Sequence, residues 1–356
     1  MPGVSANRIL LTGLLAGGGV LLFIALLNRR LIIVRDSRLK VPVLLLVLLL
    51  LMGGAIWIAR WLPVAVQIGI AALLYLGLLG GEVRRVMLRR RYAGSPPMDT
   101  MLHDVPLHRP LTTTDLVIHR YQILLPEWKG PPFRIVHLSD FHANAWIEES
   151  FYRKTVERAM AIEADLAFYT GDYVTRREAI PLLERFLRPI GRVGDFAVLG
   201  NHDHWTDPDR IAQVLRDKGI RVLRGESIET DLDGHTVEIW GCDYAGYCAW
   251  TIPPPIRSQP GVKLALCHTP DAIRALVSRG ASVVFSGHNH AGQARIPLLG
   301  PIIVPSRFGR LFDHGHFVIE GTHLFVSSGV GAATPPLRLY CQPDLFLVEI
   351  WGKGEN

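Results

Sequence analysis

Five short polar motifs, each closing an apolar run, constrain this chain more than any other feature. The runs are short and nearly continuous in apolar residues, which is typical of strands buried on both faces. The motifs supply seven side chains that can bind a metal, namely Asp140, His142, Asp172, Asn201, His268, His288 and His290. Because ligands of open α/β sheets gather beyond the carboxyl ends of the strands, we expect these side chains to meet at one edge.

The pattern after residue 130 predicts the α/β class with antiparallel additions. Strands are expected at 133–138, 165–170, 196–199, 262–266 and 282–285, with a further strand before them at 116–125. Helices are expected at 147–163, 178–186, 208–218 and 270–279, the last two opened by an Asp-Pro or Thr-Pro pair and closed by glycine. A hairpin is expected at 223–240, and late strands at 323–326 and 345–351.

The first part of the chain carries three long uncharged stretches, at 9–27, 41–58 and 61–81. Each is long enough to cross a hydrocarbon core of about 30 Å as a helix. A cleaved signal peptide is the alternative for the first stretch, but its apolar core would be about 7–15 residues and a small-residue cleavage site should follow. We therefore expect a membrane domain at 1–91 with three transmembrane helices, a linker at 92–115 and an α/β domain at 116–356.

Basic residues cluster on one side of these three stretches. One cluster lies between the first and second stretches, and consists of Arg29, Arg30, Arg35, Arg38 and Lys40. The other follows the third stretch, and consists of Arg84, Arg85, Arg89, Arg90 and Arg91. The opposite side has only Arg8 and Arg60, so the positive-inside rule puts the rest of the chain in the cytoplasm of a bacterium, below a multi-pass inner-membrane domain. Much of the net charge of +6 then serves topology and contact with anionic membrane lipids.

The seven candidate ligands combine carboxylate, amide and imidazole donors. This mixture suits Mn²⁺, Fe²⁺ or Zn²⁺ better than Ca²⁺, which prefers oxygen alone. Seven ligands exceed one set, so we expect two divalent ions, with Asp172 as the carboxylate between them. Two ions about 3.5–4 Å apart can activate water and hold a phosphoryl group. The segment 313–316 imitates a histidine pair, but it follows no buried strand and we expect it to bind no metal.

The ordered set Asp-x-His, Gly-Asp, Gly-Asn-His-Asp, His and Gly-His-x-His resembles the calcineurin-like metallophosphoesterase superfamily, over about residues 116–350. The resemblance implies a four-layer αββα sandwich. It implies that one ion is held by Asp140, His142, Asp172 and His290. It implies that the second is held by Asp172, Asn201, His268 and His288. It also implies that His202 is the general acid and that Asp203 orients it, with Mn²⁺ as the first choice of metal and Fe or Zn as alternatives.

The segments at 287–297 and 305–310 resemble one membrane-associated branch of that superfamily. The branch is similar to the YkuE and YaeI phosphodiesterases and to the membrane-anchored UDP-2,3-diacylglucosamine pyrophosphatase of chlamydiae. Ala291 departs from the branch, which commonly has glycine there, and three spans are more than one anchor. Arg307 and Arg310 are candidates for binding the substrate phosphate by bidentate contact, with solvated loop arginines as the equal alternative.

The resemblance and the apolar stretches together favour a membrane-anchored phosphoesterase that hydrolyses a phosphodiester or diphosphate bond in a lipid-linked substrate. A long apolar loop at 243–260, with Tyr244, Tyr247 and Trp250, is either packed cover or a substrate lid suited to an acyl chain. A soluble substrate such as a cyclic nucleotide is the first alternative, and a non-catalytic membrane scaffold is the second. Nucleic acid is not expected as a partner, because the soluble part lacks a basic strip interleaved with aromatic residues.

Overall fold

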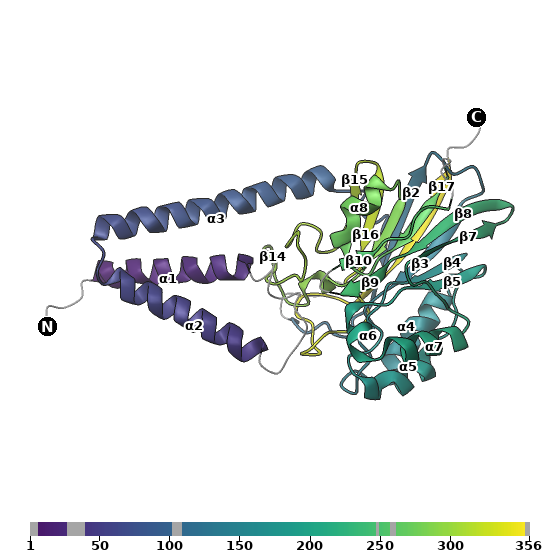
Figure 1. Cartoon of the computed structure of the whole chain (residues 1–356), viewed down its shortest axis with the longest axis horizontal. Coiled ribbons are helices and arrows are strands. Elements are labelled where there is room, and N and C mark those ends of the chain that lie inside the picture. The colour runs from purple at the N-terminus through teal and green to yellow at the C-terminus, as the bar shows by residue number, and fades with distance from the viewer. Residues whose placement is uncertain (1–5, 27–39, 102–108, 247–248, 257–260, 353–356) are drawn as a thin grey trace.

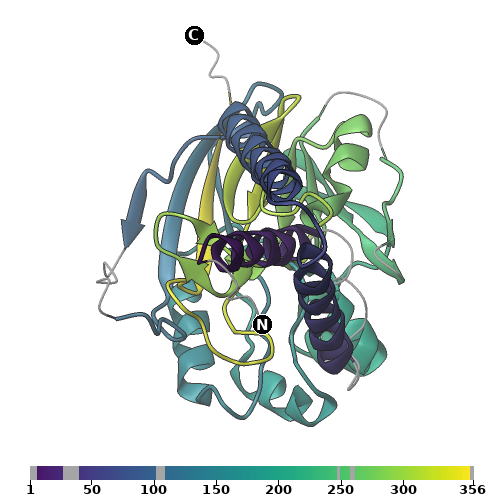
Figure 2. The ribbon, with the colours of Figure 1, turned by 90° about the vertical axis from the view of Figure 1, so that its left-hand side faces the viewer.

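Three helices extend from one side of a mixed α/β domain (Figure 1). The computed structural model describes residues 6–26, 40–101, 109–246, 249–256 and 261–352. The helices are α1 (Ala6–Leu26), α2 (Lys40–Ala59) and α3 (Val64–Tyr92). Figure 2 views them from their far ends, with the α/β domain behind them.

The three helices pack on one another through small residues and a few polar contacts. The Tyr75 hydroxyl of α3 donates to the Leu14 carbonyl of α1 over 3.0 Å, and a side chain at Gly18 would overlap Leu74. Glycine allows such a close approach between apolar helices. Within the described residues, two helices are long and apolar enough to cross a membrane, Pro42–Ala59 and Val64–Tyr92, whereas the apolar part of α1, Ile9–Ala25, is shorter. Four residues of the first expected basic cluster, Arg29, Arg30, Arg35 and Arg38, lie outside the described residues.

Two large sheets form the body of the α/β domain. The first has the order β1-β2-β17-β3-β4-β5-β6. Its strands are β1 (Asp99–Met101), β2 (Val117–Leu125), β17 (Asp344–Gly352), β3 (Phe133–Leu138), β4 (Leu166–Tyr169), β5 (Gly194–Ala197) and β6 (Arg221–Val222). The second has the order β15-β16-β12-β11-β8-β7. Its strands are β15 (Gly315–Ile319), β16 (Thr322–Val326), β12 (Val283–Ser286), β11 (Lys263–Leu266), β8 (His235–Gly241) and β7 (Glu226–Leu232).

The two sheets face each other across an aromatic core. Phe285 of the second sheet lies 5.1 Å from Phe168 of the first, ring centre to centre, and Phe325 of the second sheet lies 5.2 Å from Tyr121 of the first. Helices cover the other face of the first sheet, namely α4 (Glu149–Met160), α5 (Ile180–Phe186) and α7 (Pro208–Asp217). The outer face of the second sheet is covered by α8 (Ile273–Ser278) and by the end of α3. These mixed sheets and their layers agree with the fold that the resemblance implied.

The observed elements differ from the expected ones mainly at their ends. The strand expected at 196–199 is β5, two residues earlier, and the expected linker contributes β1, which pairs antiparallel with β2. The sequence did not predict α6 (Asn201–Thr206), because its six polar and aromatic residues have no apolar period. It also did not predict two short hairpins, β9 (Asp243–Gly246) with β10 (Ala249–Thr251), and β13 (Arg295–Ile296) with β14 (Gly300–Pro301).

Replacing Phe346 by alanine tests the core between the sheets. Phe346 is fully buried and contacts aromatic rings from both sheets, so Phe346→Ala should lower the free energy of unfolding by about 3–5 kcal/mol. Leu124→Ala on the neighbouring strand is the control, because Leu124 is exposed and its loss should cost little. Thermal unfolding of both variants measures the difference, and equal stabilities would contradict this packing.

Candidate metal centre

The seven candidate ligands follow five strands in the two sheets. Asp140 and His142 come after β3, Asp172 after β4, and Asn201 after β5. The strands β3, β4 and β5 run parallel, so their carboxyl ends share one edge. In the second sheet, His268 follows β11, and His288 and His290 follow the parallel strand β12. The structure therefore collects ligands from both sheets, and all seven are buried except His288, which is partly buried.

One group of four side chains gathers around the imidazole of His142. Its Nε2 lies 3.1 Å from Nε2 of His290 and 3.4 Å from Oδ2 of Asp172. Nε2 of His290 lies 3.3 Å from Oδ1 of Asp140. These four residues form a cluster with metal-ligand geometry, and they are the four that the resemblance assigns to the first ion.

A second group gathers around the imidazole of His268. Its Nε2 lies 3.2 Å from Oδ2 of Asp172, 3.1 Å from Oδ1 of Asn201 and 3.1 Å from Nδ1 of His288. Oδ2 of Asp172 thus belongs to both groups. A single carboxylate oxygen between two sets of donors is the arrangement expected of a bridging ligand.

Hydrogen bonds aim the ligand atoms into the two groups. One oxygen of Asp172, Oδ1, accepts the backbone N–H of His202 at 2.9 Å, which leaves Oδ2 for the centre. Oδ2 of Asp140 accepts the Ser139 hydroxyl at 2.5 Å and the His288 N–H at 2.9 Å. Nδ1 of His268 lies 2.6 Å from the Thr170 carbonyl, so Nδ1 donates to that carbonyl and Nε2 is the ring atom that faces the centre.

The charge states of these groups suit cation binding. Burial opposes ionisation of Asp172, but the neighbouring His268 and His202 hold its pKa well below its usual range. His290 does the same for the pKa of Asp140 against the effect of burial. Burial, followed by the charge on His268, lowers the pKa of His288 to about 3. Two anionic carboxylates and a neutral imidazole are the forms in which these residues bind metals.

Five of the seven candidate ligands have positive φ, between 39° and 66°, namely Asp140, His142, Asp172, His288 and His290. A non-glycine residue in this region is strained by roughly 1–2 kcal/mol, and such strain persists where the surrounding fold imposes it at a functional site. The glycines of the motifs are required for a different reason, which is the lack of space for a side chain. A side chain at Gly200 would overlap the carboxylate of Asp172, and one at Gly287 would overlap Asp140.

The donor atoms fit divalent ions. Ligands about 2.1 Å from one ion lie roughly 3.0–3.4 Å apart when they are neighbours in octahedral or tetrahedral geometry. Six donor pairs in the two groups are 3.1–3.4 Å apart, and Nε2 of His142 lies 4.0 Å from Oδ1 of Asp140. Several of these pairs bring two lone pairs together. A cation between them removes that repulsion, so both groups are suited to hold one ion each.

The Gly-Asn-His-Asp motif places two further residues at the centre. The ring of His202 stands edge-on to His142, 4.9 Å between centres. Asp203 accepts the backbone N–H groups of Gly200, Asp172 and Tyr173 at 2.7–2.8 Å, and so holds together the loops that carry Asp172 and Asn201. Burial and the charge of Asp172 raise the pKa of Asp203 to about 7. Orientation of His202 by Asp203 stays a prediction.

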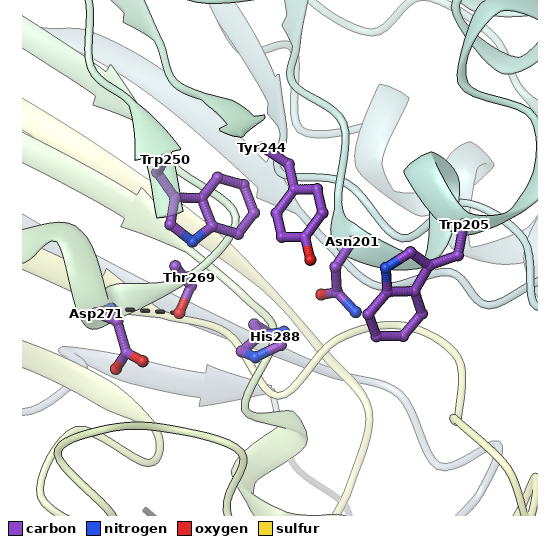
Figure 3. Close-up of a pocket in the computed structure, with 7 residues that line it drawn as sticks. All are labelled: Asn201, Trp205, Tyr244, Trp250, Thr269, Asp271 and His288. Carbon is purple, nitrogen blue, oxygen red and sulfur yellow. Dashed lines mark hydrogen bonds between the residues drawn. The ribbon is translucent and has the colours of Figure 1, made fainter. Parts of the chain in front are cut away.

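An aromatic pocket opens beside the second group (Figure 3). It is lined by Asn201 and His288 from that group and by Trp205, Tyr244, Trp250, Thr269 and Asp271. The ring of Trp250 lies 5.8 Å from that of His268. The described part of the loop at 243–260 therefore covers the metal centre, while Tyr247 lies outside the described residues.

The two arginines expected to bind phosphate lie in different surroundings. The backbone N–H of Arg307 donates at 3.0 Å to Asp271, which lines the aromatic pocket. The guanidinium of Arg310 pairs with Glu82 of α3 at 2.5 Å and contacts the Pro301 carbonyl. No local sequence pattern predicts this pairing, because the partners are 228 residues apart. Phosphate binding by either arginine stays a prediction.

A second ion-pair network also joins α3 to the metal-binding loop. Asp313 is buried and pairs with Arg89 of α3 and, at 2.9 Å, with Arg295. Arg295 in turn donates to the carbonyl of Ala291, next to His290. The end of α3 is therefore fixed to the segment that supplies two ligands.

One histidine cluster lies away from the centre and was not expected. His314 donates to Asp344 over 2.6 Å, and His119 lies 4.0 Å from the same oxygen. Asp344 also accepts the Ser327 hydroxyl and the Ser328 N–H, so its oxygens already have protein partners. We read this cluster as a structural link between strands; that segment 313–316 binds no metal stays a prediction.

Comparison with known proteins agrees with the geometry. The family model of calcineurin-like phosphoesterases matches residues 133–292. A metallophosphoesterase of Aquifex aeolicus is 31% identical over 261 residues, which cover 68% of this chain and 95% of that protein. The chain belongs to the calcineurin-like phosphoesterases. It is similar to metallophosphoesterase YkuE of Bacillus subtilis, at 28% identity over 60% of this chain and 77% of YkuE. It is also similar to phosphodiesterase YaeI of Escherichia coli, at 26% over 65% of this chain and 87% of YaeI.

Membership makes the chain a metal-dependent phosphoesterase, a hydrolase whose family uses divalent metals. Ala291 is the residue at which the sequence departs from the branch that it resembles, and its backbone conformation explains why glycine is common there. Ala291 has a φ of 49°, a conformation that glycine adopts without strain. The common glycine therefore suits the backbone of this loop, and this chain has alanine directly after the ligand His290.

Asp172→Asn tests the shared ligand. An amide cannot supply the anionic oxygen that both groups use, so this variant should lose both ions and hydrolyse bis-p-nitrophenyl phosphate at no more than background rate. His290→Ala should reduce metal content mainly at the first group. Asp209→Asn, at an exposed carboxylate of α7, is the matched control. Normal turnover by Asp172→Asn, with metal content unchanged, would refute the assignment.

Proposed function

We propose that this phosphoesterase is anchored in a bacterial inner membrane and hydrolyses a phosphodiester or diphosphate bond of a lipid-linked molecule on the cytoplasmic side. The substrate would resemble a phospholipid or UDP-2,3-diacylglucosamine. The observation that carries the reaction class is the pair of ligand groups that share Oδ2 of Asp172. Three membrane spans, the domain boundaries at 91 and 115, and Mn²⁺ as the metal are part of the same proposal.

The residues at the centre would have different roles in the reaction. Bound divalent ions would supply the charge that activates water and neutralises the phosphoryl group. Asn201 and the imidazoles would hold the ions, and Asp172 would be a ligand common to both groups through Oδ2. His202, beside His142, would protonate the leaving oxygen. Arg307, whose backbone N–H donates to Asp271 of the aromatic pocket, would stabilise negative charge on the substrate.

Two features support a substrate that lies in the membrane. Figure 1 shows α6, which begins at Asn201, and β14 on the side of the domain that faces the three helices. A groove of about 490 Å³ begins at Ala143, next to His142, and its walls include Trp146, Leu182 and Arg176. Apolar walls with an arginine suit a molecule that combines acyl chains with phosphate.

A soluble substrate remains the competing candidate, and the aromatic pocket is the observation that favours it. Trp205, Tyr244 and Trp250 surround the opening beside His288 (Figure 3), and such rings can stack on a nucleobase as well as contact an acyl chain. The scaffold alternative has less support, because all seven candidate ligands are present.

A substrate panel separates these candidates. Full-length protein loaded with Mn²⁺ should hydrolyse UDP-2,3-diacylglucosamine or a phospholipid in vesicles with a higher kcat/KM than cyclic nucleotides. Trp250→Ala should lower turnover of the lipid substrate more than that of bis-p-nitrophenyl phosphate, whereas Trp351→Ala, at an exposed site on β17, should change neither. A preference for cyclic nucleotides would contradict the lipid substrate, and equal loss on both substrates would contradict the lid.

A further inference from the structure

The hairpin β13–β14 ends in an exposed apolar tip. The strands are joined by Pro297, Leu298 and Leu299, with Ile296 opposite Gly300. Leu298 is fully exposed, and Leu299 is 67% exposed. Together with Ile296, which is also exposed, these leucines form what we call the hairpin patch.

The chemistry of this tip is unfavourable in water. Turns in water usually consist of glycine, asparagine, aspartate or serine, which satisfy the backbone and tolerate unusual angles. Leu298 instead has a φ of 68°, which costs a bulky residue roughly 1–2 kcal/mol relative to glycine. Most of the surface of both leucines is exposed, so side-chain contacts within the described part of the chain offset little of this cost. An apolar environment outside the protein would offset them, at about 25 cal/mol for each Å² of apolar surface removed from water.

The hairpin lies at the level where α3 leaves its apolar stretch. Glu82 is the first charged residue after the uncharged run 61–81. Arg310 pairs with Glu82 and also donates to the carbonyl of Pro301 in β14. Figure 1 shows β14 beside the end of α1, on the side of the domain that faces the helices. The tip is therefore next to the point at which a transmembrane α3 would enter the headgroup region.

Ion pairs also fix the position of the hairpin along α3. Arg89 of α3 pairs with buried Asp313, and Asp313 pairs with Arg295 at the start of the hairpin. Leu88 and Tyr92 of α3 pack on the core outside the second sheet. A helix of 29 residues is about 43 Å long, so α3 exceeds an apolar layer of about 30 Å by roughly nine residues. The excess lies at the C-terminal end of α3, which includes Arg84 to Arg91 and contacts the α/β domain.

We propose that the hairpin patch is a membrane-contact surface, with Leu298 and Leu299 inserted at the headgroup boundary of the bilayer. The partner is a lipid surface, and the nearby arginines of α3 suit anionic headgroups. The proposal rests on the proposed membrane location and not on the proposed substrate. Because the hairpin begins five residues after His290, the same segment contacts the membrane and supplies metal ligands.

Environment-sensitive labels on the full-length protein test this surface. Single cysteines replace Leu298, Leu73 or Leu124 in a Cys248→Ser background, and the cysteines at 242, 267 and 341 are buried. Leu73 is exposed on α3 and reports the apolar layer, whereas Leu124 is exposed on β2. Each variant is labelled with nitrobenzoxadiazole and reconstituted in phosphatidylcholine–phosphatidylglycerol vesicles that carry a nitroxide near the headgroup or at the chain end. Hydrolysis of bis-p-nitrophenyl phosphate checks that each protein is folded.

The label at 298 should shift to the blue and be quenched most by the nitroxide near the headgroup. The label at 73 should be quenched most by the nitroxide at the chain end, and the label at 124 by neither. Quenching at 73 without quenching at 298 would overturn the hairpin proposal while the membrane location stands. Absence of quenching at both would overturn the membrane location and the hairpin proposal with it. A blue shift at 298 that depends on protein concentration, without quenching, would assign the patch to a second copy and also overturn the proposal.

Discussion

The carboxylate of Asp172 is the interaction on which the rest of this structure depends. Its two oxygens have different surroundings, because Oδ1 accepts the N–H of His202 and Oδ2 faces both His142 and His268. That division joins two groups of ligands from two sheets into one centre. It also explains why the following motif must begin with glycine, since any side chain at Gly200 would occupy the place of this carboxylate.

Without cations, burial of this cluster of carboxylates and imidazoles destabilises the folded protein. Two carboxylates and four imidazoles are removed from water at the edge of the sheets, and five of the ligands adopt strained backbone conformations. The aromatic core between the sheets holds the strand ends in place against that cost. The centre is thus preorganised by the fold, and binding of cations would relieve the repulsion that the fold imposes.

The sequence predicted the parts that depend on local pattern. Apolar runs predicted β3 and β11 to within a residue, and the strand-end motifs predicted which side chains meet. It could not predict contacts between distant segments that have no period, such as Asp203 with the backbone of Asp172, or Arg310 with Glu82. The positive φ of the ligands and the fixing of α3 to the metal-binding loop also follow only from the folded chain. A domain that begins at residue 116 would lose Arg89 and with it the ion pair to Asp313.

Anomalous diffraction from crystals grown with Mn²⁺ tests the shared-ligand account most directly. The account predicts two anomalous peaks about 3.5–4 Å apart, one among Asp140, His142 and His290, the other among Asn201, His268 and His288, with Oδ2 of Asp172 between them. A single peak, or two peaks that do not share Asp172, would contradict it.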